Sequence, residues 1–324
     1  MIFRIYKADS EKNIQEDVVI MIRIGIIGSD SSHALAFSKL TNIKDNKTSE
    51  YNFPDVRVTG IFGLEKEKTK RVAEEGQIEF VADKPEDLAA KVDAVMVVFR
   101  HGDLHAPYAL PFIKIGMPVW IDKPFTIKVP DAKQLIKEAK KSKCLLTGGS
   151  TCKYAYDILM LRNVVENPEK IDGIQAGAFN FPADLDSEYG GLFFYGGHLA
   201  EMMLTVFGYD VKSVSAYECN GNVVAVAKYD NYYVTLNFLK KTSEHKGIVY
   251  GGSKTVIRDL DRSIVYCLGF AKFVEMLQTG KMPMSFQQLI TPILLMNAIT
   301  ESLKTRKEVN IVDFAGDSDV FEAT

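Results

Sequence analysis

Alternating apolar and amphipathic segments in the first 150 residues constrain the fold most strongly. Apolar runs bounded by turns and separated by helix-like stretches are typical of a parallel sheet whose strands are joined by crossover helices. The expected strands are residues 22–28, 56–63, 78–83, 92–99, 118–122 and 144–149, and the expected helices include 65–75, 104–115 and 131–141. Because such crossovers are right-handed, we predict a doubly wound α/β domain of Rossmann type over residues 22–149.

The pattern changes after residue 149. A helix (154–165) and a long strand (173–181) precede a glycine-rich stretch. The strand-like runs 211–218, 222–230 and 232–239 then follow, joined by turns too short for crossover helices, so they should pair antiparallel. The hairpin-like segment 247–260 continues this sheet, and two helices follow at 270–278 and 286–304, the second bent at Pro292. We expect an α+β domain over residues 150–324 with a large, mostly antiparallel open sheet.

Length and composition fit two globular domains. The chain has 324 residues, 47% of them hydrophobic and 25% charged, enough to build two cores. Its net charge of -3 gives no overall attraction for nucleic acid or for an anionic membrane, so a small-molecule partner is expected. The four scattered cysteines favour reduced thiols in a cytoplasm. Residues 1–21 lack the apolar run of a signal or membrane segment, and we expect them to be an extension outside the fold.

The first strand leads into the segment GIIGSDSSH. A dinucleotide site uses a strand, a glycine turn and a helix N-terminus, because free N–H groups and the helix dipole favour the pyrophosphate charge. Gly28 fills the first place of the G-x-G-x-x-G pattern, whereas Asp30 and His33 stand where the other two glycines belong. The alternative is an ordinary turn in which Asp30 or Ser31 caps the helix.

The second strand ends in IFGLEKEK, where an acid that binds the adenosine ribose is expected. Gly63 occupies that place. Glu65 is a substitute, while Lys66 and Lys68 are candidates for a 2′-phosphate or for an ordinary solvated helix face, so NAD and NADP both remain open.

The segment WIDKPFTI (120–127) places Lys123 between a buried strand and a proline. This is the carboxyl edge of the sheet, where open α/β sheets bind ligands. Partial desolvation there would lower the pKa of Lys123 and fit it for proton transfer. A surface lysine beside a turn proline is the other interpretation.

These pieces, together with VDAVMVV, LHAPYALPFIKIG and YGGLFFYGGHLAE, resemble the Gfo/Idh/MocA family, named for glucose-fructose oxidoreductase and inositol dehydrogenase. The resemblance spans about residues 22–311. It implies an NAD(P)-dependent oxidoreductase in which Lys123 and His198 are catalytic. Many members have an aspartate four residues before that histidine; here the place holds Phe194, and Tyr195 is the nearest group able to exchange a proton.

The resemblance also implies contacts for the cofactor and the substrate. Cofactor contacts are expected from Gly28, Ser29, Asp30, Ser31, Ser32, His33, Gly63, Leu64, Glu65, Phe99, Arg100 and Asp122. Substrate contacts are expected from His105, Lys153 and Tyr195. No metal site is predicted, because the spacing of His101, Asp103 and His105 matches no structural zinc pattern.

Three functions are compatible with this sequence. The first is hydride transfer to or from a sugar, polyol or related hydroxy compound. The second is a lyase or hydrolase that retains its cofactor and oxidises a sugar transiently. The third is a ligand-binding protein whose activity has decayed, which the departures at Asp30, His33, Gly63 and Phe194 would fit. A homodimer or homotetramer formed through the second sheet is expected, because helices can cover only one of its faces.

The unusual glycine turn yields one further expectation. A carboxylate pointing at the pyrophosphate would set like charges against each other, so Asp30 should turn away and cap the first helix. The backbone N–H groups of Ser31, Ser32 and His33, and a protonated His33 ring, would then face the phosphate.

Overall fold

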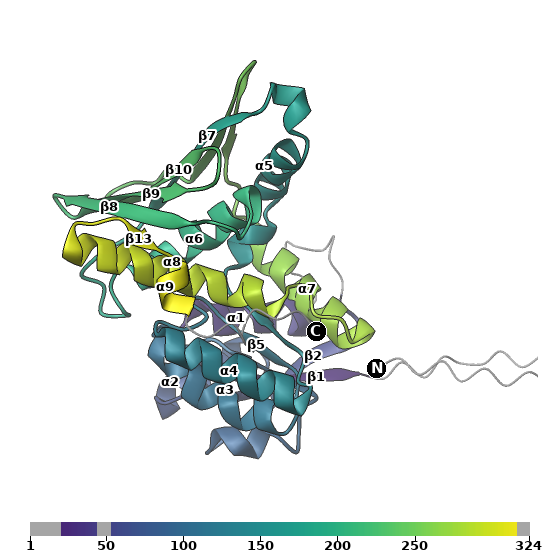
Figure 1. Cartoon of the computed structure of the whole chain (residues 1–324). Coiled ribbons are helices and arrows are strands. Elements are labelled where there is room, and N and C mark those ends of the chain that lie inside the picture. Colours follow the sequence, from purple (N-terminus) through teal and green to yellow (C-terminus); the bar gives the residue numbers. More distant parts are fainter. Residues whose placement is uncertain (1–20, 44–52, 316–324) are drawn as a thin grey trace, which may run out of the picture.

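The N-terminal half of the chain forms a six-stranded parallel sheet (Figure 1). The computed structural model describes residues 21–43 and 53–315. The strands are β1 (Ile22–Ile27), β2 (Val56–Phe62), β3 (Phe80–Val81), β4 (Ala94–Val97), β5 (Val119–Ile121) and β6 (Leu146–Gly148). Their order, β3-β2-β1-β4-β5-β6, reverses between β1 and β4, and the carboxyl ends of the strands at such a reversal are where open α/β sheets bind ligands. The predicted Rossmann sheet is confirmed.

Helices cover both faces of this sheet because its strands are apolar on both sides. In β4, Ala94 and Met96 face one core cluster, while Val95 and Val97 face the other. The helices α1 (Ser32–Asn42) and α2 (Lys66–Glu75) pack on the first face, and α3 (His105–Lys114) and α4 (Val129–Ser142) pack on the second. Short 3-10 helices lie at η1 (Pro85–Leu88) and η2 (Gly102–Leu104).

The second half forms a seven-stranded sheet in the order β12-β11-β7-β10-β9-β8-β13. Its strands are β7 (Ile174–Pro182), β8 (Ser213–Cys219), β9 (Asn222–Lys228), β10 (Tyr233–Leu239), β11 (Lys246–Gly251), β12 (Thr255–Asp259) and β13 (Val309–Asn310). Only the β7–β10 pair is parallel. The predicted α+β domain with a mostly antiparallel sheet is therefore confirmed.

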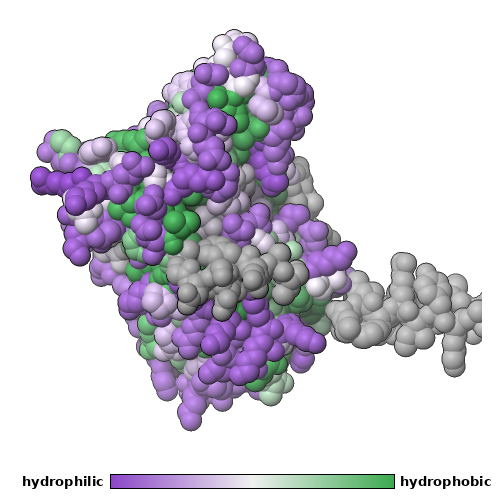
Figure 2. All heavy atoms as spheres, in the orientation of Figure 1, coloured by the Kyte–Doolittle hydropathy of each residue, from purple (hydrophilic) through white to green (hydrophobic). Residues whose placement is uncertain are grey.

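One face of the larger sheet carries the helices α5 (Tyr156–Glu166), α6 (Phe193–Phe207) and α8 (Phe286–Thr305). The strands alternate accordingly: in β9, Val223 and Ala225 are fully buried, whereas Val224 between them is exposed. Figure 2 shows apolar residues mixed with polar ones over the upper half of the molecule, where this sheet lies. The remaining elements are η3 (Thr151–Tyr154), η4 (Pro168–Ile171) and α9 (Val312–Ala315).

Helix α7 (Val265–Thr279) belongs by sequence to the second half but packs on the first sheet. Its Phe270 ring stacks on Phe37 of α1 with 6.0 Å between ring centres, and Phe273 meets Trp120 of β5 edge to face at the same distance. The helix begins five residues before the predicted start at 270, because its first turns pack against η3. The N-terminal core is thus completed by a segment from beyond residue 264.

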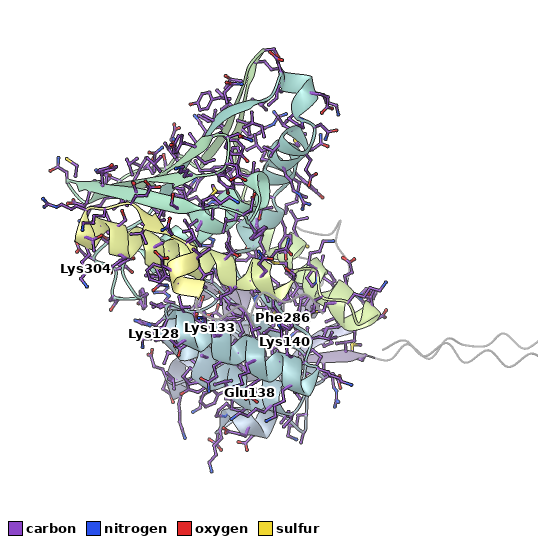
Figure 3. All side chains as sticks on the ribbon, in the orientation of Figure 1. Lys128, Lys133, Glu138, Lys140, Phe286 and Lys304 are labelled. Atoms are coloured by element: carbon purple, nitrogen blue, oxygen red, sulfur yellow. The ribbon has the colours of Figure 1, made fainter. Side chains whose placement is uncertain are left out.

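Helix α8 also links the two halves (Figure 3). Lys140 of α4 places its ammonium nitrogen 5.8 Å from the centre of the Phe286 ring at the start of α8. Further along, the Asn297 amide donates to the carbonyl oxygen of Ile127, at 2.9 Å, in the segment after Lys123. Pro292 lies inside α8, which nevertheless continues to Thr305. Among the described residues, no helix has the length and apolar character needed to cross a bilayer.

Candidate active site

The turn after β1 offers a row of unpaired backbone donors. Gly28 has a φ of +111°, and a Cβ atom there would lie 2.8 Å from the backbone nitrogen of Phe99, so only glycine fits. Helix α1 then begins at Ser32. Within the described part of the chain, the backbone N–H groups of Ser29, Asp30, Ser31 and Ser32 have no protein acceptor. Donors at a helix N-terminus fit the diphosphate of a dinucleotide.

Asp30 does not cap α1, so that expectation was wrong. The cap is Ser31, whose hydroxyl oxygen accepts from the His33 backbone N–H at 3.2 Å. Asp30 Oδ2 instead accepts from the backbone N–H of Arg100, at 3.1 Å, in the loop after β4. The carboxylate is held by this loop, away from the first turn of α1.

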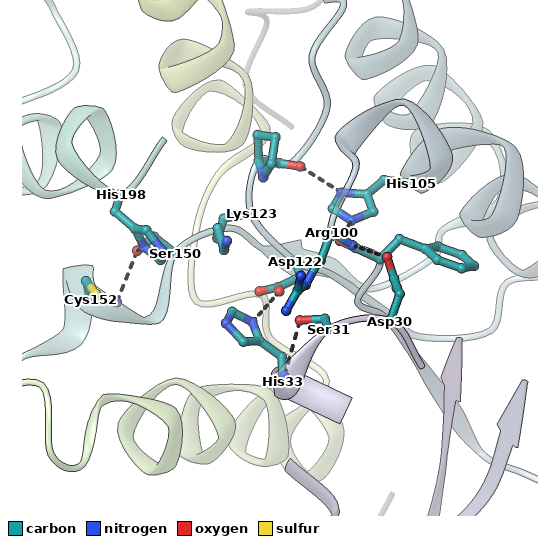
Figure 4. Close-up of polar contacts among 12 residues, drawn as sticks. Asp30, Ser31, His33, Arg100, His105, Asp122, Lys123, Ser150, Cys152 and His198 are labelled. Carbon is teal, nitrogen blue, oxygen red and sulfur yellow. Dashed lines mark hydrogen bonds and ion pairs between the residues drawn. The ribbon is translucent and has the colours of Figure 1, made fainter. Parts of the chain in front are cut away.

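The His33 ring is engaged with a carboxylate in this structure, and its expected role toward the phosphate stays a prediction. The ring is buried, and Nδ1 contacts Oδ2 of Asp122 at the end of β5 (Figure 4). Burial disfavours the Asp122 carboxylate, but the neighbouring His33, with Lys123 and His105, outweighs it, so the pKa of Asp122 lies below its ordinary value. The third glycine position of the fingerprint therefore holds a side chain that ties the β1 turn to the β5 turn.

Neighbouring side chains leave no room for any residue larger than glycine at position 63. A Cβ atom there would lie 2.0 Å from Ser29 Oγ and 2.4 Å from Thr69 Oγ1, two hydroxyls that are 2.8 Å apart. Ser29 thus joins the β1 turn to α2, and no acid fits at the end of β2. Leu64 and Glu65 after it are exposed.

The two candidate 2′-phosphate lysines have carboxylate neighbours. Lys66 lies 3.6 Å from Asp83, and Lys68 lies 3.7 Å from Glu65. Both fit the solvated helix face that was the alternative interpretation of these charges.

Lys123 is 5% exposed and is the second residue after β5, with a cis bond to Pro124. Its ammonium nitrogen lies 4.1 Å from the centre of the Phe194 ring and 5.5 Å from that of Tyr195, and it donates to the Phe194 carbonyl oxygen at 3.4 Å. Burial lowers the pKa of Lys123, and the nearby Asp122 carboxylate only partly opposes this. Lys123 is therefore a lysine suited to exchanging a proton.

His198 lies in α6, one turn after Phe194, and its ring is buried. Its Nδ1 is 2.6 Å from the hydroxyl oxygen of Ser150, which also accepts from the Cys152 backbone N–H at 3.1 Å (Figure 4). Burial, and then the positive charge of Lys123, lower the pKa of His198 well below its usual range. The ring is therefore neutral at pH 7.

Two predicted substrate contacts are already bonded to the protein, and their role toward a substrate stays a prediction. Lys153 is buried and donates to Glu201 at 2.8 Å and to the Gly148 carbonyl oxygen at 2.6 Å. His105 is fully buried, with Nδ1 2.7 Å from the Pro124 carbonyl oxygen and Nε2 2.9 Å from that of Phe99. Both hold the structure together, because their polar atoms are already bonded to the protein. Tyr195 remains 40% exposed beside Lys123.

The three residues weighed as a metal site are also engaged elsewhere. Asp103 pairs with Lys128 at 3.2 Å, and His101 accepts from the Asp103 backbone N–H at 3.3 Å. Within residues 21–43 and 53–315, no group of three or more potential ligands is arranged to hold a metal ion.

Ser150 is the site residue that the sequence analysis missed. It follows β6 at the carboxyl edge of the sheet, the same position from which β5 presents Lys123. The one feature of the sequence that could have indicated Ser150 is its position directly after the strand-like run CLLTGG. A single serine there is too common to point to a histidine 48 residues away.

Comparison with known proteins agrees with this architecture. Residues 22–150 match a family model described as an oxidoreductase family with an NAD-binding Rossmann fold. Among solved structures, a probable dehydrogenase from Thermotoga maritima is similar with a TM-score of 0.76 and 17% identity, over 90% of this chain and 100% of that one. No curated protein sequence matches the chain.

Two further similar structures contain ligands. Scyllo-inositol dehydrogenase from Lactobacillus casei, with NAD(H) and scyllo-inositol bound, has a TM-score of 0.74 and 13% identity. An oxidoreductase from Agrobacterium radiobacter, in complex with NAD+, L-tartaric acid and magnesium, has a TM-score of 0.71 and 16% identity. Each match covers 90% of this chain and 99% of the other.

The N-terminal half therefore matches the NAD-binding Rossmann domain of an oxidoreductase family, and the whole chain shares the fold of solved dehydrogenases. Over residues 22–150 the chain is similar to the Gfo/Idh/MocA family, as the sequence motifs had indicated.

Proposed function

We propose that this protein is an NAD-dependent dehydrogenase or reductase acting on a CH–OH group of a sugar, polyol or related hydroxy compound. The observation that carries the proposal is the placement of Lys123 against Phe194 of α6, one turn before His198, while the adjacent Asp122 contacts His33 at the start of α1 (Figure 4). Lys123 and His198 are both buried, and the charge of Lys123 acts on the His198 ring. Removing a hydride from a secondary alcohol also requires removal of the hydroxyl proton, and these two groups are placed to handle it.

Lys123 is assigned as the proton acceptor in alcohol oxidation. Its lowered pKa makes the neutral amine available at a lower pH than for an ordinary lysine. In the direction of ketone reduction, the ammonium form returns the proton to the oxygen.

His198 is assigned as a hydrogen-bond donor to the same substrate oxygen. Ser150 Oγ already accepts from the Cys152 N–H, so its own proton is best donated to Nδ1 of His198. A neutral ring whose Nδ1 accepts must carry its proton on Nε2. That N–H stabilises the negative charge that develops on the oxygen as the proton leaves.

The bound NAD supplies the hydride acceptor or donor. Its diphosphate would lie on the free N–H groups of residues 29–32, and the loop from Phe99 to Arg100 would flank the nicotinamide. Asp122 has one buried carboxylate oxygen, Oδ1, without a hydrogen-bond partner among the described residues, and it is the candidate acceptor for a ribose hydroxyl.

The solved neighbours support the substrate class. One holds a cyclic polyol, scyllo-inositol, and another a hydroxy acid, L-tartaric acid, each together with the nicotinamide cofactor. At this level of identity the likeness shows the fold, so the substrate class stays a proposal to be tested on the protein itself.

The test uses the purified protein with NAD and a panel of polyols and sugars, followed at the nicotinamide absorbance. We expect Lys123→Met to abolish turnover while leaving the affinity for NAD within a few-fold, because the lysine acts on the substrate proton. Lys137→Met on the exposed side of α4 is the matched control and should retain activity. Turnover by Lys123→Met at the wild-type rate would remove the proposal.

A further inference from the structure

Three side chains of the C-terminal domain form a cluster next to His198. The Phe181 ring, at the end of β7, has its centre 5.4 Å from that of His198 and 4.8 Å from that of His245. The guanidinium carbon of Arg262 lies 5.8 Å from the centre of the same ring. His245 precedes β11 and Arg262 follows β12, and both strands have these ends beside the end of β7. We call these three residues the Phe181 cluster.

The basic groups of the Phe181 cluster lack a carboxylate partner within the described ranges. Among the residues that the structure describes, Arg262 makes no ion pair and the buried Nε2 of His245 has no hydrogen-bond partner. The acids around Arg262 are occupied by backbone donors: Asp157 accepts from the Asp261 N–H at 3.0 Å, and Asp261 accepts from the Ser263 N–H at 2.8 Å. These bonds hold the loop that presents the guanidinium group.

Basic groups dominate the surroundings of His198. Burial lowers the pKa of His198 most, and Lys123, His33, Arg262 and His245 lower it further. The buried carboxylates of the site, Asp122 and Glu201, are already paired with His33 and Lys153. The loop before α6 has exposed acids, but Asp186 pairs with Lys240 at 3.4 Å.

We propose that the substrate of this site carries an anionic group, a carboxylate or a phosphate, which Arg262 binds beside Phe181 and His245. The exposed guanidinium group matches the geometry of either anion, and the buried Phe181 ring lies between His245 and His198 and so connects the anion position to the catalytic side of the site. The inference rests on the proposed dehydrogenase function and narrows it to hydroxy acids, sugar acids or sugar phosphates.

The test compares matched probes that differ mainly in charge. Gluconate is paired with sorbitol, and glucose 6-phosphate with glucose, and each is titrated into NAD-loaded protein by calorimetry and assayed for turnover. We expect one of the anionic probes to bind roughly 10- to 100-fold more tightly than its neutral partner, the difference that one charge-assisted contact supplies. The pair that shows the difference distinguishes a carboxylate from a phosphate.

Variants of Arg262 locate the effect. Arg262→Gln should lose the preference for the anion, and Arg262→Lys should keep much of it. Arg258→Gln on the exposed strand β12 is the control with the same change of charge and should keep all of it.

Two outcomes overturn the inference: neutral probes that bind as tightly as anionic ones, or an anionic preference that survives in Arg262→Gln. Anion binding without turnover would sustain the inference and contradict the proposed function. Efficient oxidation of neutral polyols without any preference for anions would support the proposed function and contradict the inference about the anionic group.

Discussion

Phe194 places an aromatic face against Lys123, at the position where the family resemblance led us to look for an aspartate. A ring attracts the ammonium group more weakly than a carboxylate would, so the neutral amine is easier to reach. Phe194 was one of the departures that would fit a protein with decayed activity. Its contact with Lys123 instead fits an active enzyme in which Lys123 accepts the proton.

The pH dependence of turnover tests this interpretation. The rate of alcohol oxidation should rise with pH as Lys123 loses its proton. Because the pKa of Lys123 is lowered, the rate should level off at a pH below the ordinary lysine pKa of about 10.4. Phe194→Asp adds a carboxylate that stabilises the ammonium form, so the rise should move to higher pH. A rise at the same pH in both proteins, measured as kcat/KM, would contradict the role of Lys123.

The Ser150 hydroxyl gives His198 a defined tautomer. Nitrogen NMR of histidine-labelled protein, which has only five histidines, should show an unprotonated Nδ1 and a protonated Nε2 for the residue that disappears in His198→Asn. Ser150→Ala removes the donor and should mix the two tautomers, with a fall in kcat and little change in KM, because the donor acts mainly on the developing charge. An Nδ1-protonated ring in the wild-type protein would refute the assignment.

At the scale of elements, the site depends on turns that follow neighbouring parallel strands. The His33–Asp122 contact joins the turn after β1 to the turn after β5, and the two strands are separated by β4. Sequence patterns predicted each strand but not this contact, because side-chain contacts across two strands leave no trace in the local pattern. The same reason hid the burial of Lys153 and His105.

The His33–Asp122 pair should contribute to stability. His33→Ala leaves a buried carboxylate without its partner, and we expect it to lower the free energy of unfolding by about 3 to 5 kcal/mol at pH 7. Because the folded pKa of Asp122 is lowered, this contribution is complete above the ordinary carboxyl pKa, near 3.9, and is lost as pH falls through the lower folded value.

Urea unfolding of His33→Ala, Asp122→Asn and the double variant measures this pair. The double variant should be more stable than the sum of the two single losses predicts, since it leaves no unpaired charge. Strict additivity of the two losses would show that the residues do not act as a pair.

At the scale of the whole molecule, the open face of the larger sheet is apolar in part. Tyr217, Val224, Tyr233, Tyr250 and Ile257 are each more than a third exposed, and the strand registers place them on this face. Exposed apolar residues gathered on one sheet face are typical of an interface, and we propose that two chains pair there.

Light scattering at micromolar concentration should therefore give two or four times the 36.2 kDa of one chain. Tyr233→Lys should reduce that mass, because it places a charge in the middle of the face. Ile115→Lys, at an equally exposed apolar residue after α3, should not. A single-chain mass for the wild-type protein would contradict the pairing.

The two-sheet architecture could be predicted from the chain because strand periodicity and turn length are local properties. The alternation over residues 22–149 predicted the parallel sheet, and the short turns between residues 211 and 239 predicted antiparallel pairing. The return of α7 to the first sheet could not be predicted in this way. Its apolar residues, Phe270 and Phe273 among them, could pack in the core of either sheet. The sequence pattern does not distinguish the two cores, because it records only that these residues are apolar.

That return of α7 has a consequence for how the protein is made. A ribosome completes all six strands of the N-terminal sheet by residue 148, but the helix that covers Phe37 and Trp120 is synthesised more than a hundred residues later. Until then the nascent Rossmann layer exposes part of its own core, so it is a natural client for chaperones during translation.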